Sequence, residues 1–155
     1  MTLADIKKAL LDIMKGSYPS TQYKYYSKEV VEKFERPCFF TEISIDSSEP
    51  ASAGADHFLA TFSIEILQAV VDEATALGIG NTLRRKFGRY FMVRDLESNK
   101  DRAVKVRNYD FDFIGTDNNV PTIMVTLEWY DHIDKHETAD MMEDVDVSLT
   151  VQVEE

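Results

Sequence analysis

The sequence predicts an α+β fold, in which a mostly antiparallel sheet, made of a hairpin and a meander, packs against an N-terminal helix and a middle helix. Two runs carry this prediction, residues 58–67 and 121–130, because apolar and polar side chains alternate along both at the period of a strand. The third observation is the helical periodicity of residues 2–15. Each alternating run has one apolar face, and helices are the natural cover for it.

The first predicted element is a helix over residues 2–15. Thr2 can cap this helix, and Asp5 stands three residues later, which is the spacing of a capping box. Gly16 and Pro19 end it. The apolar residues of the helix form one stripe, which we expect to cover the sheet: Leu3, Ile6, Leu10, Ile13 and Met14.

Two strands follow the helix. Residues 23–26 are rich in tyrosine and predict a short strand. A stacking platform for single-stranded nucleic acid is the alternative, but few basic residues surround it. Residues 37–45 predict a strong strand with Pro37 at its first position, where a missing N–H does least harm. Cys38 lies in this strand, and we favour a buried, inert thiol over a nucleophile.

Residues 46–57 are small and polar and contain Pro50 and Gly54, so they predict a loop. The loop joins the strand over residues 37–45 to the strand over residues 58–67. The prediction is therefore a β-hairpin with a long tip. Contact with a partner is one reason for a loop of this length.

Residues 69–89 predict the middle helix, which Gly78 and Gly80 weaken. The glycines can split it into two short helices or permit close packing on the sheet. Their spacing fits neither the dinucleotide-binding fingerprint nor the P-loop pattern.

The rest of the chain predicts strands. Residues 91–94, 103–114 and 121–130 form a meander with short polar connections. Residues 145–153 alternate strictly and predict a terminal strand, which pairs within the chain or adds to a neighbouring subunit. At 155 residues the chain is most simply one folded domain over residues 1–131, followed by an acidic extension over residues 132–155.

The net charge of −11 is distributed unevenly. Residues 128–155 hold ten acids and one base, a net −9, whereas residues 83–107 hold nine bases and three acids, a net +6. A chain with a basic middle and an acidic end can attract copies of itself head to tail. It is poorly suited to wrapping a polyanion. The candidate interface residues are Arg84, Arg85, Lys86, Arg89, Asp131, Asp134, Glu143 and Asp144.

No motif of a catalytic, nucleotide-binding or zinc site occurs at a convincing spacing. The acidic run with Asp131, His132, Asp134 and His136 suggests a metal site, but it lacks a fixed scaffold and the HExxH spacing. We therefore expect no enzyme activity, no metal and no cofactor. No apolar run approaches the ~20 residues of a membrane helix, and the first residues do not have the pattern of a signal peptide. With one cysteine, the default is a cytosolic folding compartment.

The order helix, hairpin, helix, meander resembles the small tail terminator proteins of long-tailed phages and phage-tail-like particles. The strings that carry the resemblance are residues 36–40, which open the hairpin, residues 58–67, which close it, and residues 126–130, which end the meander. The resemblance covers residues 1–131.

This resemblance implies a structural protein that forms a hexameric ring. Such a ring caps the tail tube, ends its polymerisation and provides the joint to the head-side connector or the sheath. The implied partners are other copies of the chain, the tail tube protein and the sheath or connector proteins, with no membrane and no sequence-specific nucleic acid. The implied location is the host cytoplasm during assembly and then the head-proximal end of the tail. The alternatives are a neck or tail-completion adaptor of the same particle and an unrelated small ligand-binding α/β domain, which would need a deep pocket.

Overall fold

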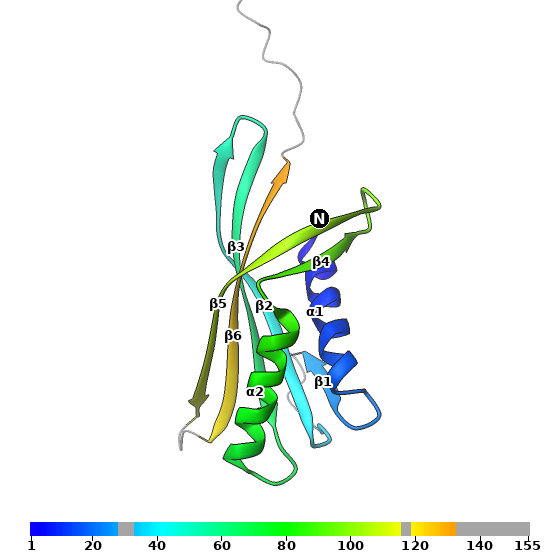
Figure 1. Cartoon of the computed structure of the whole chain (residues 1–155), viewed down its shortest axis with the longest axis vertical. Coiled ribbons are helices and arrows are strands. Elements are labelled where there is room, and N and C mark those ends of the chain that lie inside the picture. Colours follow the sequence, from blue (N-terminus) through cyan, green and yellow to red (C-terminus); the bar gives the residue numbers. More distant parts are fainter. Residues whose placement is uncertain (28–32, 116–118, 133–155) are drawn as a thin grey trace, which may run out of the picture.

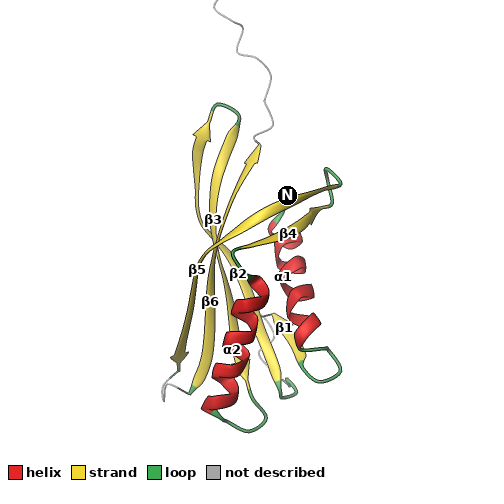
Figure 2. Ribbon diagram, in the orientation of Figure 1, coloured by secondary structure: helices red, strands yellow, loops and turns green. Residues whose placement is uncertain are grey.

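A curled sheet of six strands makes up most of the molecule, and two helices lie on one of its sides (Figures 1 and 2). A computed structural model describes residues 1–27, 33–115 and 119–132. The elements follow in the order α1 (Leu3–Ser17), β1 (Lys24–Ser27), β2 (Cys38–Ser52), β3 (Ala55–Leu67), α2 (Glu73–Phe87), β4 (Tyr90–Asp95), β5 (Lys100–Ile114) and β6 (Val120–His132). In the sheet the order is β1-β2-β3-β6-β5-β4, and each neighbouring pair is antiparallel except β1 with β2. The predicted α+β class is confirmed.

The core lies between the sheet and the two helices. β3 and β6 pair without a register shift, and their alternating apolar side chains all lie on the helix side. Burial of each large apolar side chain contributes about 1.5–3 kcal/mol. The fully buried residues of these two strands and α1 are Ala60, Phe62, Ile64, Ile66, Ile123, Val125, Leu127, Ile6, Leu10 and Met14.

The predicted capping box at the start of α1 is confirmed. The Thr2 hydroxyl accepts a hydrogen bond from the Asp5 N–H at 3.2 Å, and the Asp5 carboxylate accepts one from the Thr2 N–H at 2.9 Å. These two bonds satisfy N–H groups that the helix itself leaves without partners.

The tyrosine-rich strand is confirmed as β1, which pairs in parallel with the start of β2. Its rings are part of the core edge rather than an open platform. Tyr25 packs on Phe39 with ring centroids 5.4 Å apart, and its hydroxyl donates to the Tyr18 carbonyl oxygen at 2.6 Å. Cys38 is fully buried, and burial raises the pKa of its thiol, which keeps the thiolate form rare.

The β2–β3 hairpin is confirmed, but the long loop predicted over residues 46–57 is wrong. Both strands continue to a tight turn between Ser52 and Ala55, and their end extends beyond the helices (Figure 2). The small polar composition is tolerated because, among the described residues, this part of β2 pairs with β3 alone, and Pro50 removes no ladder bond that the sheet needs. Asp46 and Ala51 are extra residues in β2 that form β-bulges, and the pairing with β3 shifts by one residue at each.

The predicted middle helix is confirmed as α2, which is shorter than expected and is not split by its glycines. Asp72 caps it by accepting a hydrogen bond from the Thr75 N–H at 2.9 Å. Gly80 permits the close packing that the sequence offered as the second possibility. A Cβ at this position would lie 2.7 and 2.8 Å from two ring carbons of Phe111 on β5.

The meander of β4, β5 and β6 is confirmed, and β5 is bent. Val106 faces Leu127 and Asn108 faces Thr126, so Arg107 is an extra residue that forms a β-bulge. Before the bulge, β5 turns away from β6 and pairs with β4 near α1 (Figure 1). The bend curls the sheet around the helices.

No helix among the described residues has the length and apolar character to cross a membrane. The terminal strand predicted over residues 145–153 lies outside the described residues.

Two glycine substitutions test the packing of α2. Gly80→Ala should lower the free energy of unfolding, because overpacking against Phe111 costs about 1–3 kcal/mol, which exceeds the helix propensity gain of at most about 1 kcal/mol. Gly78→Ala is the matched control, since a Cβ there meets nothing within 4 Å. It should raise stability by up to about 1 kcal/mol. Urea denaturation measures both, and an equal gain in the two variants would contradict the close contact.

Candidate functional site

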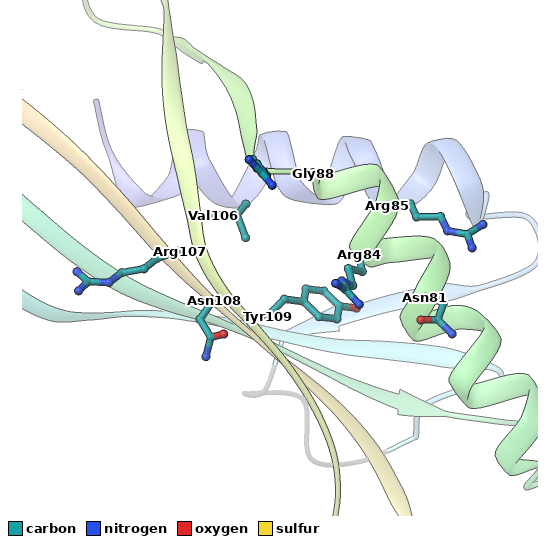
Figure 3. Close-up of a pocket in the computed structure, with 9 residues that line it drawn as sticks. Asn81, Arg84, Arg85, Gly88, Val106, Arg107, Asn108 and Tyr109 are labelled. Atoms are coloured by element: carbon teal, nitrogen blue, oxygen red, sulfur yellow. The ribbon is translucent and has the colours of Figure 1, made fainter.

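A basic groove lies between the C-terminal part of α2 and the bend of β5 (Figure 3). It is open to solvent and has a volume of about 700 Å³. Its lining residues are Asn81, Arg84, Arg85, Gly88, Arg89, Val106, Arg107, Asn108 and Tyr109. The groove contains four arginines, more basic residues than any other hollow described among the placed residues.

The end of α2 fixes one wall of the groove. Gly88 has a φ of 62°, which is a left-handed conformation that favours glycine, and its N–H donates to the Arg84 carbonyl oxygen at 3.1 Å. The Arg89 carbonyl oxygen then accepts a hydrogen bond from the Val106 N–H at 2.8 Å. The turn after the helix is therefore tied to β5 directly before the bulge.

Tyr109 lies at the floor of the groove. Its hydroxyl donates to the Gly80 carbonyl oxygen at 2.7 Å, and burial raises the pKa of the phenol well above its ordinary range. Arg84 lies near this hydroxyl, whereas Arg85 and Arg107 extend away from the groove centre on either side (Figure 3). The floor is thus neutral and fixed, and the charges line the rim.

The arginines of the α2 wall have no carboxylate partners in the described ranges. Arg84, Arg85, Lys86 and Arg89 are exposed, and the ion pairs of the described residues involve other cations. Three of these four predicted interface residues line the groove, and Lys86 does not. An acidic partner that binds these four cations therefore displaces no ion pair of the described residues.

Asp131 is paired inside the chain instead of facing outward alone. Its carboxylate accepts hydrogen bonds from Arg102 and, at 3.1 Å, from the Met1 amino group. Burial alone would raise the pKa of Asp131, but these two cations outweigh it and lower the pKa. The other predicted acidic candidates, Asp134, Glu143 and Asp144, lie outside the described residues.

A second charged cluster lies on the sheet face that the helices leave uncovered. Glu128 on β6 has a side chain that is only 11% exposed. Its Oε1 lies 2.9 Å from His57 Nε2, and its Oε2 lies 2.8 Å from Lys105 Nζ. The Lys105 ammonium group lowers the pKa of Glu128 against the opposing effect of burial, and His57 adds to the lowering. This cluster ties β3, β6 and β5 together across three strands.

Sequence reasoning found Arg84, Arg85 and Arg89 but did not single out Arg107. Arg107 belongs to the basic stretch over residues 83–107, which was a usable signal. Its place in the groove depends on the bulge in β5, and no residue pattern in the sequence marks that bulge.

The family model of phage tail terminator proteins matches residues 5–139 of the chain. No curated protein matches it significantly. Seventeen chains of solved structures match it. One of them, whose description states no function, covers 86% of this chain and 94% of its own, with 15% sequence identity and a TM-score of 0.50. At this identity the likeness concerns the fold alone.

The pKa of Glu128 gives a pH prediction. Because the folded-state pKa lies below the ordinary value of 4.5, the contribution of the ionised group is present above pH 4.5 and is lost as the pH falls through the lower value. Glu128→Gln should therefore destabilise the chain at neutral pH, and its deficit should shrink in acid. Urea denaturation over a pH series measures this difference. Glu97→Gln, in an exposed turn, is the control, and an equal deficit at all pH values for Glu128→Gln would contradict the prediction.

Proposed function

Because the chain belongs to the phage tail terminator family, we propose that it acts as one subunit of a closed ring that ends a phage tail. Membership of the family assigns it a structural role in tail completion. The ring is a hexamer that caps the tail tube, stops the addition of tube subunits and provides the joint to the head-side connector or the sheath. The single observation that carries this proposal is the family match, which covers residues 5–139 of 155.

The subunit contact is the physical requirement of the ring. A closed ring of identical subunits joins two different surfaces of the same chain, with a rotation that closes. The groove supplies one surface, because Arg84, Arg85 and Arg89 have no carboxylate partner among the described residues, whereas Arg107 lies 3.7 Å from Glu128 Oε1. The acidic residues after Asp131 supply the charge of the other surface, with Asp134, Glu143 and Asp144 as the candidates. Asp131 itself contributes less, since Arg102 and the Met1 amino group already balance its charge.

The proposed partners follow from the ring. They are other copies of the chain, the tail tube protein and the sheath or connector proteins. The chain assembles in the host cytoplasm and then lies at the head-proximal end of the tail. No reaction is part of this role, since stopping and joining require only complementary surfaces.

Electron microscopy of particles that lack the protein tests the role directly. Tail tubes of uncontrolled length are the expected result, because nothing then stops tube growth. Headless tails of normal length would contradict termination and favour the adaptor role. Light scattering of the purified chain, alone and with tube protein, tests the ring, and a strict monomer in both conditions would count against it.

Charge reversal tests the proposed contact. Replacing Arg84, Arg85, Lys86 and Arg89 with Glu should weaken self-association at low salt, where the Debye length reaches about 30 Å at 0.01 M. Added salt should weaken the association of the wild-type chain in the same direction. Sedimentation velocity over a concentration series measures both effects.

The control for this test has an equal change of charge at exposed residues away from the groove, by substituting Glu at Lys15, Lys24, Lys33 and Arg36. It should associate more strongly than the groove variant at every salt concentration. If the groove variant associates as the wild type does, charge pairing at this groove is wrong, even if the ring exists.

A further inference from the structure

β4 forms an open edge of the sheet. In the part of the chain that the structure describes, β4 pairs with β5 alone. Two apolar side chains on its outer face are largely exposed, Tyr90 at 61% and Met92 at 59%. An unpaired edge with exposed apolar side chains is a template for another strand.

A hollow runs along this edge beside α1. It has a volume of about 440 Å³, and apolar residues from both sides line it, Ala9 and Ile13 from the helix and Met92 and Leu96 from the strand side. The charges that line it balance, with Lys8 and Arg94 against Asp5 and Asp12. The hollow therefore offers apolar contact to alternate side chains of an added strand.

The edge begins directly at the basic groove. Gly88 and Arg89 line the groove, and Tyr90 is the first residue of β4. Along the chain direction the surface presents unpaired arginines first and the apolar edge second.

The C-terminal sequence has the same order with the opposite charge. Residues 134–146 hold six acids and one base, and residues 145–153 alternate valine or leucine with polar residues. If residues 145–153 lie parallel to β4, the acidic residues before them lie against the arginines of the groove, and their apolar side chains lie in the hollow. Both charge and pattern then match in a single alignment.

We propose that residues 145–153 of a second copy add to β4 as a parallel strand, with the acidic residues of that copy against the basic groove. This inference rests on the proposed self-assembly and names the segment that makes the contact. The added strand pairs the open backbone groups of β4 and covers Met92. Each subunit gives one segment and receives one, which is the arrangement that a closed ring repeats.

The position of His132 favours a second copy over the same chain. His132 and Asp95 line one hollow at the end of β4, so the C-terminal residues leave the described fold at that end. A parallel strand from the same chain would require residues 133–144 to run back along all of β4 first. An antiparallel strand from the same chain would place the acids at the Asp95 end of β4, away from the arginines of the groove.

Cross-linking between two populations of the full chain tests the proposal. One population carries Met92→Cys and an affinity tag, and the other carries Val147→Cys, Leu149→Cys or Val151→Cys. After mild oxidation of the mixture, tagged chains should shift from 17.8 kDa to twice that mass on a non-reducing gel. The native Cys38 does not compete, because it is fully buried.

The matched control carries Ile45→Cys, which replaces a side chain that is 47% exposed on β2. It should give little mixed dimer with the same C-terminal variants. Equal yields at Met92 and Ile45 would overturn the proposal, and so would a chain with both Met92→Cys and Leu149→Cys that closes only its own disulfide.

The outcomes separate this inference from the proposed function. If wild-type chains associate in sedimentation but the Met92 mixture gives no dimer, the strand addition is wrong and the ring stands. If wild-type chains remain monomeric with and without tube protein, both are wrong. A chain ending at residue 144 gives a second measurement, because it should lose most of the association while keeping its cooperative unfolding transition.

Discussion

The antiparallel pairing of β3 with β6 is the constraint on which the rest of the molecule depends. Its register runs without a shift from Ala55 opposite His132 to Glu65 opposite Thr122. Because side chains alternate along a strand, this register places the apolar set of both strands on one face. The two helices cover that face. The opposite face is exposed to solvent and therefore carries polar side chains. The Glu128 cluster lies there, so the sheet is held by burial on one side and by ion pairs on the other.

The same elements that build the core also present the charges. α2 packs Leu83 and Phe87 into the core and thereby turns Arg84 and Arg85 outward. The groove floor at Tyr109 is bonded to the helix backbone, so the arginines are carried on a rigid frame. A structural protein of tail completion needs surfaces held in fixed positions. The bond from Tyr109 to the Gly80 carbonyl oxygen and the bond from Val106 to the Arg89 carbonyl oxygen hold the two walls of the groove in such positions.

Most of the fold could be predicted from the sequence, because its long elements have strong periodicity. The stripe of α1 and the alternation in β3 and β6 gave the layers and the class. The end of the hairpin could not be predicted, since residues 46–57 are polar and hold together partly through β6, a strand far along the chain that pairs with residues 55–57. For the site, consecutive arginines marked α2 as the basic wall. Arg107 was missed because its place in the groove comes from a bulge, which depends on pairing between strands rather than on local residue type.

The bulge at Arg107 also decides which side chains of β5 face the core. The pairing of β5 with β6 shifts by one residue at this point, because Val106 pairs with Leu127 and Asn108 pairs with Thr126. Loss of this single extra residue would leave a regular ladder with the same partners, Val106 opposite Leu127 and Asn108 opposite Thr126, and Tyr109 and Phe111 would still point inward. A residue lost elsewhere in β5 would instead turn the side chains beyond it to the other face, and the fit between Phe111 and Gly80 would vanish. The tolerance of β5 for a change of length is therefore confined to the bulge, where such a change would straighten the strand and reshape the basic groove.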